Sequence, residues 1–149
     1  MNDGSCIFCR IVQKQIPASV VYEDERVLAF LDIKPLSEGH TLVIPKAHYE
    51  NIFDIPLELI EYVHGVTKQI AFAVKKVANA NGISIIQQNG KAAGQDVFHL
   101  HVHVIPRYEG QKLPSFSEPS AANREELNQT ATEIRKYLLD YADSAGFSV

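Results

Sequence analysis

Three histidines alternate with apolar residues in the segment 98–105, which has the sequence FHLHVHVI. An alternation with a period of two is typical of a β-strand, because successive side chains of a strand point to opposite faces. His99, His101 and His103 are therefore expected to share one face. The apolar residues are expected to pack into the core on the other face: Phe98, Leu100, Val102 and Val104. Valine or threonine would pack as well as three titratable rings, so the pattern favours a functional site over a polar strand surface.

These histidines could also bind a metal, since imidazole is a common zinc ligand. On one straight strand, successive rings on a face stand ~6.6–6.8 Å apart, because the rise is ~3.3–3.4 Å per residue. A zinc ion with Zn–N distances of ~2.0–2.1 Å could reach all three rings only if the strand were strongly distorted. One or two of the histidines could be ligands if residues from elsewhere complete the site.

Short apolar runs bounded by polar turns predict further strands. They lie at 20–22, 26–32, 41–45 and 83–88. Apolar residues at helical spacing between Leu59 and Val77 predict a long helix. Asp54 and Pro56 suit its start and Gly82 its end.

A short helix or turn is expected at 6–14, and an irregular loop at 108–122. Asn123 and Glu126 form a capping pair for a C-terminal helix. One face of that helix carries Leu127, Ala131, Ile134 and Leu138. These elements predict an α+β fold in which an antiparallel sheet of about five strands packs with one long central helix and a C-terminal helix.

The chain has 149 residues and a formal net charge of −4. At this length one core suffices, so residues 1–149 are expected to form a single domain, with its core at 6–107 and a C-terminal loop and helix at 108–149. The negative charge predicts no general attraction to nucleic acid or acidic membranes. No apolar run approaches the ~18 residues that span a bilayer. The polar start of the chain predicts no export signal, so a cytoplasmic location is expected.

Cys6 and Cys9 are the only cysteines, and their Cys-x2-Cys spacing is typical of half a zinc site. The same spacing occurs in thioredoxin-like redox pairs, which usually follow a strand and begin a helix. Here no strand is expected before Cys6. A tetrahedral zinc site would need two further ligands from elsewhere in the chain.

Several segments together resemble the histidine triad family. The residues at 99–105 match its pattern His-φ-His-φ-His-φ-φ, where φ is apolar. The segments VVYEDE at 20–25, LAFLDI at 28–33, GHTLVIPK at 39–46 and GQDV at 94–97 are also similar to the family. With its cysteine pair, the chain looks like the bacterial-type Hit proteins, which are related to the Hint branch. The resemblance implies a homodimer that hydrolyses or transfers nucleotides through a nucleotidyl-histidine intermediate.

By this resemblance, His101 is the nucleophile and His103 holds a phosphate oxygen. His40 matches a family histidine that supports the triad. Neutral imidazole, with an ordinary pKa of ~6.5, suits attack on phosphorus near neutral pH. Charge that builds on the non-bridging oxygens must meet preorganised donors.

The resemblance also implies contacts to the nucleotide. Asp32 would accept hydrogen bonds from the ribose. The apolar slot for the base, adenine by family expectation, would comprise Phe8, Ile11, Phe30 and Ile33. The phosphate would meet Gln88 and the loop residues Gly94, Gln95, Asp96 and Val97. Asp96 stands where better-known branches carry serine or threonine, whose hydroxyl assists the leaving group.

Relatives that keep the cysteines look as if they bind zinc, which implies the ligand set Cys6, Cys9, His48 and His99. Four protein ligands leave no open position, so this zinc would be structural. His101 and His103 would then be available for catalysis. His64, on the long helix, is expected at the surface.

Two other function classes stay open on the sequence alone. The first is a nucleotide-binding sensor or scaffold with slow turnover, and the second is a zinc-stabilised redox module. For an enzyme, the substrate could be a nucleoside phosphoramidate, an acyl-adenylate or a dinucleoside polyphosphate. The long helix is apolar around much of its circumference, which favours a homodimer.

Overall fold

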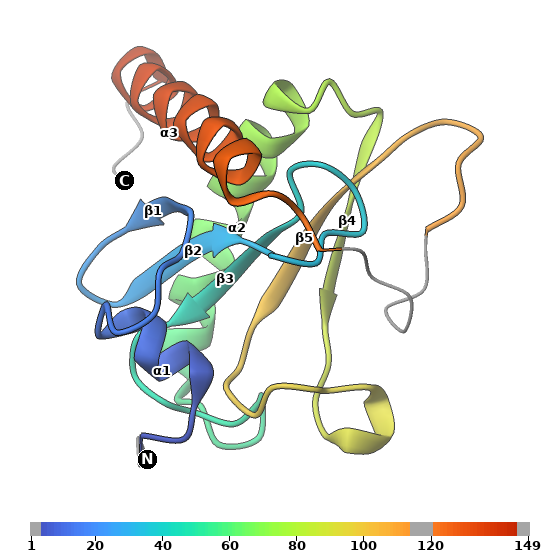
Figure 1. Ribbon diagram of the computed structural model, residues 1–149. Helices are drawn as coiled ribbons and strands as arrows, with labels where there is room; N and C mark the ends of the chain where they lie inside the picture. The colour runs from blue at the N-terminus through green and yellow to red at the C-terminus, as the bar shows by residue number, and fades with distance from the viewer. Residues whose placement is uncertain (1–3, 114–120, 146–149) are drawn as a thin grey trace.

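The computed structural model describes residues 4–113 and 121–145, and its centre is a five-stranded antiparallel sheet with the order β1-β2-β3-β5-β4 (Figure 1). The strands are β1 (Val20–Glu23), β2 (Val27–Leu31), β3 (Thr41–Pro45), β4 (Gly82–Gln87) and β5 (Val102–Arg107). The helices are α1 (Ile7–Val12), α2 (Leu57–Val77) and α3 (Arg124–Ala145), with a short 3-10 turn, η1, at Lys91–Ala93. The α+β prediction is confirmed.

Helices cover both faces of the sheet. The main core lies on the face covered by α2 and α3, where Leu31, Val43 and Ile70 are fully buried. On the opposite face α1 packs against a smaller cluster that includes Phe8 and Phe30. All five residues of β2 are buried because its two faces alternate between these clusters.

The histidine strand begins later than predicted. β5 starts at Val102 instead of Phe98, and the ring of Phe98 is 43% exposed instead of lying in the core. The reason is a different set of hydrogen bonds before the strand. The amide of Leu100 donates to the carbonyl of Tyr49 at 2.7 Å, which ties this segment to the chain after β3.

The ends of α2 also differ from the prediction. Pro56 is the N-cap, and the Asp54 carboxylate accepts from the amides of Glu50 and Asn51 in the preceding turn instead. At the other end the backbone turns at Asn79, whose φ is 52°, a conformation that asparagine tolerates. Gly82 therefore begins β4 and does not end the helix.

The start of α3 follows the prediction. The Asn123 side chain accepts from the amides of Glu125 and Glu126. The predicted apolar face is buried: Leu127, Ala131, Ile134 and Leu138. The part of the predicted loop at 114–120 lies outside the described residues. Among the helices that the structure describes, none has the length and apolar character to cross a membrane.

Candidate functional site

Two cysteines and two histidines converge beside α1. Cys6 precedes this helix and Cys9 lies within it, while His48 follows β3 and His99 precedes β5. Nδ1 of His99 lies 3.4 Å from Sγ of Cys6 and 3.5 Å from Sγ of Cys9. Nδ1 of His48 lies 3.3 Å from Sγ of Cys9. The structure therefore brings the four predicted zinc ligands together, with one ligand atom of each within 4.8 Å of the others.

The distances in this Cys2His2 cluster fit a tetrahedral zinc ion. Zn–N bonds of ~2.0–2.1 Å and Zn–S bonds of ~2.3 Å give N···N edges of ~3.3 Å and S···N edges of ~3.5 Å. The Nδ1 atoms of His48 and His99 lie 3.2 Å apart. The amide of Cys9 donates to Sγ of Cys6 at 3.4 Å, which orients this sulfur toward the cluster. The donor set and its spacing can hold zinc.

The outer nitrogen of His99 sets its tautomer. Nε2 donates to the carbonyl of Pro45 at 2.8 Å, so Nδ1 presents its lone pair to the thiols. Burial lowers the pKa of His99 to about 4. The ring is therefore neutral near pH 7, the form that binds a metal.

His101 carries its hydrogen on the opposite ring nitrogen from His99. Its Nδ1 lies 2.8 Å from the carbonyl oxygen of His99. A carbonyl can only accept, so Nδ1 carries the hydrogen and Nε2 of the neutral ring carries the lone pair. The side chain is buried against the Phe8 ring, whose centroid lies 5.1 Å away in an edge-to-face contact. The histidine therefore has one defined nucleophilic atom.

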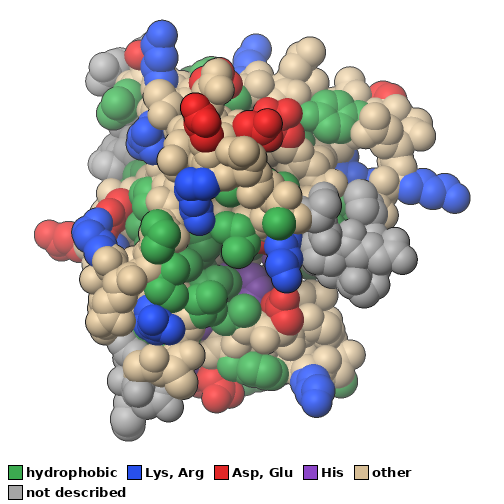
Figure 2. Space-filling view, viewed as in Figure 1, with side chains coloured by type: hydrophobic (Ala, Val, Ile, Leu, Met, Phe, Trp, Pro, Cys, Tyr) green, Lys and Arg blue, Asp and Glu red, His purple; other side chains and the backbone are tan. Residues whose placement is uncertain are grey.

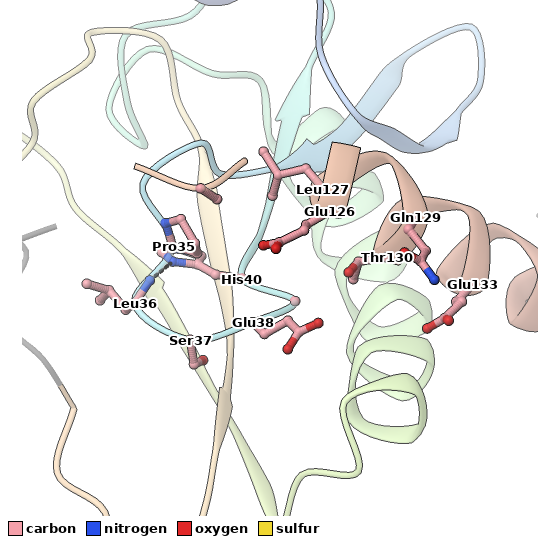
Figure 3. Close-up of a pocket in the computed structure, with 12 residues that line it drawn as sticks. Pro35, Leu36, Ser37, Glu38, His40, Glu126, Leu127, Gln129, Thr130 and Glu133 are labelled. Atoms are coloured by element: carbon pink, nitrogen blue, oxygen red, sulfur yellow. Dashed lines mark hydrogen bonds between the residues drawn. The ribbon is translucent and has the colours of Figure 1, made fainter. Parts of the chain in front are cut away.

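His40 and His103 form a second pair of histidines. The amide of Leu36 donates to Nδ1 of His40 at 3.0 Å (Figure 3). Nε2 of His40 must then carry the hydrogen, and it lies 2.9 Å from Nδ1 of His103. His103 accepts there, which leaves its Nε2 as an N–H donor. The His103 ring lies 5.0 Å from that of His101, so this donor belongs to the same site.

Burial keeps both rings of this pair neutral. Burial, together with the neighbouring histidines, lowers the pKa of His40 to about 3 and that of His103 to about 4. Asp32 lies 3.6 Å from Nε2 of His40 and accepts from the amide of Lys34. Burial raises the pKa of Asp32. Asp32, the predicted ribose acceptor, therefore lies in the same site as His40 and His103.

Three residues of the predicted base slot lie in one cluster, and the fourth lies at the surface. Phe8 and Phe30 meet edge to face at 5.5 Å, and Ile11 packs beside them. Ile33 is 49% exposed, and its carbonyl accepts from the amide of Ala122. This contact brings the segment before α3 next to the predicted slot. No sequence pattern indicated that this segment lies there.

The loop before the triad is tightly built. Gly94 has a φ of 92°, a conformation that favours glycine, and a Cβ there would displace the end of the Gln88 side chain, whose Nε2 would lie 2.6 Å away. The buried Gln95 side chain accepts from the amide of Gly90 and donates to the carbonyls of Glu50 and Val97. It joins two loops. Its predicted contact with phosphate stays a prediction.

Asp96 lies close to His101, the predicted nucleophile. Its Oδ1 atom lies 3.6 Å from Nε2 of His101 and accepts from the amide of Val97 at 2.9 Å. The side chain is otherwise 79% exposed, so it is free to rotate away. Val97 also packs against the cluster around Phe8. A negatively charged oxygen therefore occupies a position between a backbone donor and the predicted nucleophile.

Two cavities of about 630 Å³ flank these histidines. One runs from Cys6 past Asp96 and is lined by further carboxylates. The other lies behind His40, between the loop after β2 and the first turns of α3, where Glu126 and Glu133 line it (Figure 3). Carboxylates on both sides disfavour phosphate there. Histidine side chains are visible at the floor of a hollow in Figure 2. The carboxylates nearest to His101 and His40 are those of Asp96 and Asp32, and the exposed Asp96 side chain can turn away from a phosphate.

Two backbone groups that set the tautomers could not be identified from the sequence. The carbonyl of Pro45 holds His99, and the amide of Leu36 holds His40. Every non-proline residue has both groups, so no residue type signals this role. His64 is exposed, as predicted.

The HIT domain family model matches residues 13–110 of this chain. An uncharacterized HIT-like protein of Methanocaldococcus jannaschii is 48% identical over 124 residues, which cover 82% of this chain and 95% of that protein. A protein of Arabidopsis thaliana named adenylylsulfatase is 35% identical over 138 residues, which cover 91% and 70% of the two chains. A zinc-bound histidine triad family protein from Mycobacterium smegmatis matches with a TM-score of 0.83 and 42% identity, covering 95% of this chain and 97% of that one.

Proposed function

Because the chain belongs to the histidine triad (HIT) family, whose members bind and hydrolyse nucleotides, we propose that it cleaves purine nucleotide derivatives at the α-phosphate through a covalent intermediate on His101. Adenosine derivatives are the proposed substrates. The adenylylsulfatase relative supports this choice because its name describes an adenylyl group joined to a leaving group.

The tautomer of His101 is the observation that carries this proposal. The Nε2 lone pair forms a bond to the α-phosphorus while the bond to the leaving group breaks and its electron pair departs with that group. Water then attacks the phosphorus and releases a proton to the solvent, the P–N bond returns its electrons to Nε2, and the mononucleotide is released. The Nε2–H of His103, set by the chain from Leu36 through His40, would donate to the charged phosphate oxygen.

The position of the Asp96 carboxylate indicates where a phosphate oxygen could bind. Its carboxylate oxygen accepts from the Val97 amide, a donor that a phosphate oxygen could use in its place. The exposed side chain would rotate away when the substrate binds. Asp32 would accept from the ribose, and Phe8 and Phe30 would contact the base.

We also propose a structural zinc ion on Cys6, Cys9, His48 and His99. When bound, zinc supplies folding energy, and with four protein ligands it has no position open to substrate. The zinc-bound relative from Mycobacterium smegmatis supports this assignment. Both cysteines are free of disulfides, which agrees with the proposed cytoplasmic location.

A homodimer is part of the proposal. β4 is an edge strand of the sheet, and beside it Phe72 of α2 and Ile85 of β4 remain partly exposed along an apolar groove. A second copy placed there would cover the groove and the open edge. Sedimentation at micromolar concentration should show a dimer, and a monomer would contradict this part.

A substrate screen tests the central proposal. Purified protein is offered an adenosine phosphoramidate, an acyl-adenylate and a dinucleoside polyphosphate, and release of AMP is measured. Quenched samples are analysed by mass spectrometry for an adenylyl group on the peptide that contains His101. We expect turnover of at least one class and adduct on that peptide. If none of the three releases AMP, the protein is a nucleotide-binding sensor instead.

A further inference from the structure

The predicted nucleophile lies just outside the regular sheet. The pairing of β5 with β3 ends at Val43 and Val102, and its pairing with β4 ends at Gln87 and Val102. His101 is one residue before this point. The ring therefore lies at the very end of the sheet, where contacts of its side chain must fix its orientation.

His99 supplies the first of these contacts. Its carbonyl accepts the Nδ1–H of His101, and its own ring is held on both sides, by the two thiols at Nδ1 and by the Pro45 carbonyl at Nε2. The amide of Leu100 is bonded to the same chain segment after β3. The position of the nucleophile therefore depends on a residue that is itself a predicted metal ligand.

Phe8 supplies a second contact from the same cluster. It lies between Cys6 and Cys9 in the sequence, so the two thiols anchor the turn that carries it. Its buried ring meets the rings of His99 and His101 edge to face, at 5.9 and 5.1 Å. A shift of α1 would move this ring away from the nucleophile.

A metal ion would strengthen this arrangement. Sγ of Cys9 and Nδ1 of His48 and His99 lie 3.2–3.5 Å from one another, and Sγ of Cys6 lies 3.4 Å from Nδ1 of His99, which presents its lone pair because its hydrogen is on Nε2. A metal bound by all four residues would fix these atoms, whereas without it only weak thiol–imidazole hydrogen bonds hold them. A misplacement of about 1 Å is enough to cost about 10²-fold in rate.

We propose that His99 is a positioning residue that couples metal occupancy of the Cys2His2 cluster to the placement of His101, so that the metal controls turnover as well as stability. Phe8 is the second route of the same coupling. This inference rests on the proposed function only in one respect: the measurement of turnover needs a substrate that the protein hydrolyses. The position of the ring can be observed without it.

The test compares zinc-loaded and chelated wild-type protein at a temperature at which circular dichroism shows both to be folded. We expect kcat on a fluorogenic adenosine phosphoramidate to fall at least about 30-fold after chelation, with KM changed less than about threefold. The nitrogen-15 NMR signal of the His101 Nδ1–H should be sharp with zinc and broadened or lost without it. Added zinc should restore both.

Two variants keep the test decisive. Phe8→Leu retains all four ligands, and we expect one zinc per chain, a kcat lowered about tenfold and a broadened Nδ1–H signal. Ile134→Val, in α3 and in the main core on the face of the sheet opposite to α1, is the control for lost stability and should leave kcat unchanged. The inference is overturned if chelated, folded protein keeps its kcat and its Nδ1–H signal, or if Ile134→Val loses as much kcat as Phe8→Leu.

These measurements separate the two proposals. If no form of the protein releases AMP but zinc still sharpens the Nδ1–H signal, the hydrolase proposal fails and the coupling stands. If turnover is normal in zinc-free protein, the coupling fails and the hydrolase proposal stands.

Discussion

Two clusters of ionisable side chains lie within this small fold, and both have spacings that a metal could accept. One contains Cys6, Cys9, His48 and His99, and the other contains Asp32, His40 and His103. Their outer hydrogen bonds differ. A backbone carbonyl faces the outer nitrogen of His99, whereas a backbone amide faces the outer nitrogen of His40.

This difference separates a metal ligand from a proton donor. The carbonyl takes the hydrogen of His99 and leaves a lone pair toward the thiols. The amide occupies the lone pair of His40 and leaves a hydrogen toward His103. A metal on Nε2 of His40 would require a ring without any hydrogen, so the second cluster is unsuited to zinc although its spacing allows it.

Removal of His101, which contacts both clusters, should have the largest effect. His101→Ala should lower kcat by about 10⁴-fold or more, because a covalent mechanism loses its nucleophile. Binding of AMP, measured by calorimetric titration, should change less than about threefold. His64→Ala, which replaces an exposed histidine of α2, is the control and should retain full activity. A His101→Ala protein with more than a tenth of the wild-type kcat would show that the nucleophile is another group.

Metal analysis tests whether only the Cys2His2 cluster, and not the cluster around His40, binds zinc. We expect about one zinc per chain, bound by the Cys2His2 cluster. Chelation should lower Tm by about 10 °C or more, because the binding energy of a closed site is also folding energy. Cys9→Ser should abolish zinc binding and His40→Gln should not. Two zinc ions per chain, with one lost in His40→Gln, would mean that the tautomer argument is wrong.

Much of the fold could be predicted from the periodicity of apolar residues. The alternation at 98–105 predicted a strand correctly from Val102 onward, and the spacing from Leu59 to Val77 predicted α2. The start of the histidine strand could not be predicted, because the hydrogen bond from Leu100 to Tyr49 joins parts of the chain that are distant in sequence.

The sequence could name the candidate site residues but not the positions of their protons. The resemblance supplied the zinc set and the triad, and the structure places each set together. The tautomers depend on the backbone groups of Pro45 and Leu36, and Gln95 is held by backbone groups of three loop residues. Because every residue carries such groups, a sequence pattern cannot show which of them a side chain will meet.

The buried donor cluster should make stability sensitive to acid. The pKa of His40 is about 3 when folded and about 6.5 when unfolded, so below pH 6.5 only the unfolded chain gains this proton. Stability therefore falls as the pH drops toward the folded pKa. From pH 7 to pH 5 this one group should cost about 2 kcal/mol of unfolding free energy. His40→Gln should lose that much less over the same range in urea unfolding. Equal losses in both proteins would show that His40 titrates normally.

Asp96 should have the smallest effect, and its direction depends on the substrate. The carboxylate lies 3.6 Å from Nε2 of His101 and repels an anionic leaving group, but it attracts a cationic amine such as a lysyl group. Asp96→Ser should therefore keep or raise kcat/KM on a dinucleoside polyphosphate, by up to about fivefold, and lower it by a similar factor on a lysyl phosphoramidate. Glu50→Gln is the matched control, because this exposed carboxylate lines the same cavity without an ion pair to His101, and it should change neither value by more than about twofold. The ratio of the two kcat/KM values reports how transition-state stabilisation differs between the leaving groups. A loss of several hundredfold on both substrates would instead make Asp96 a group that the reaction itself requires, most simply a proton donor to the leaving atom.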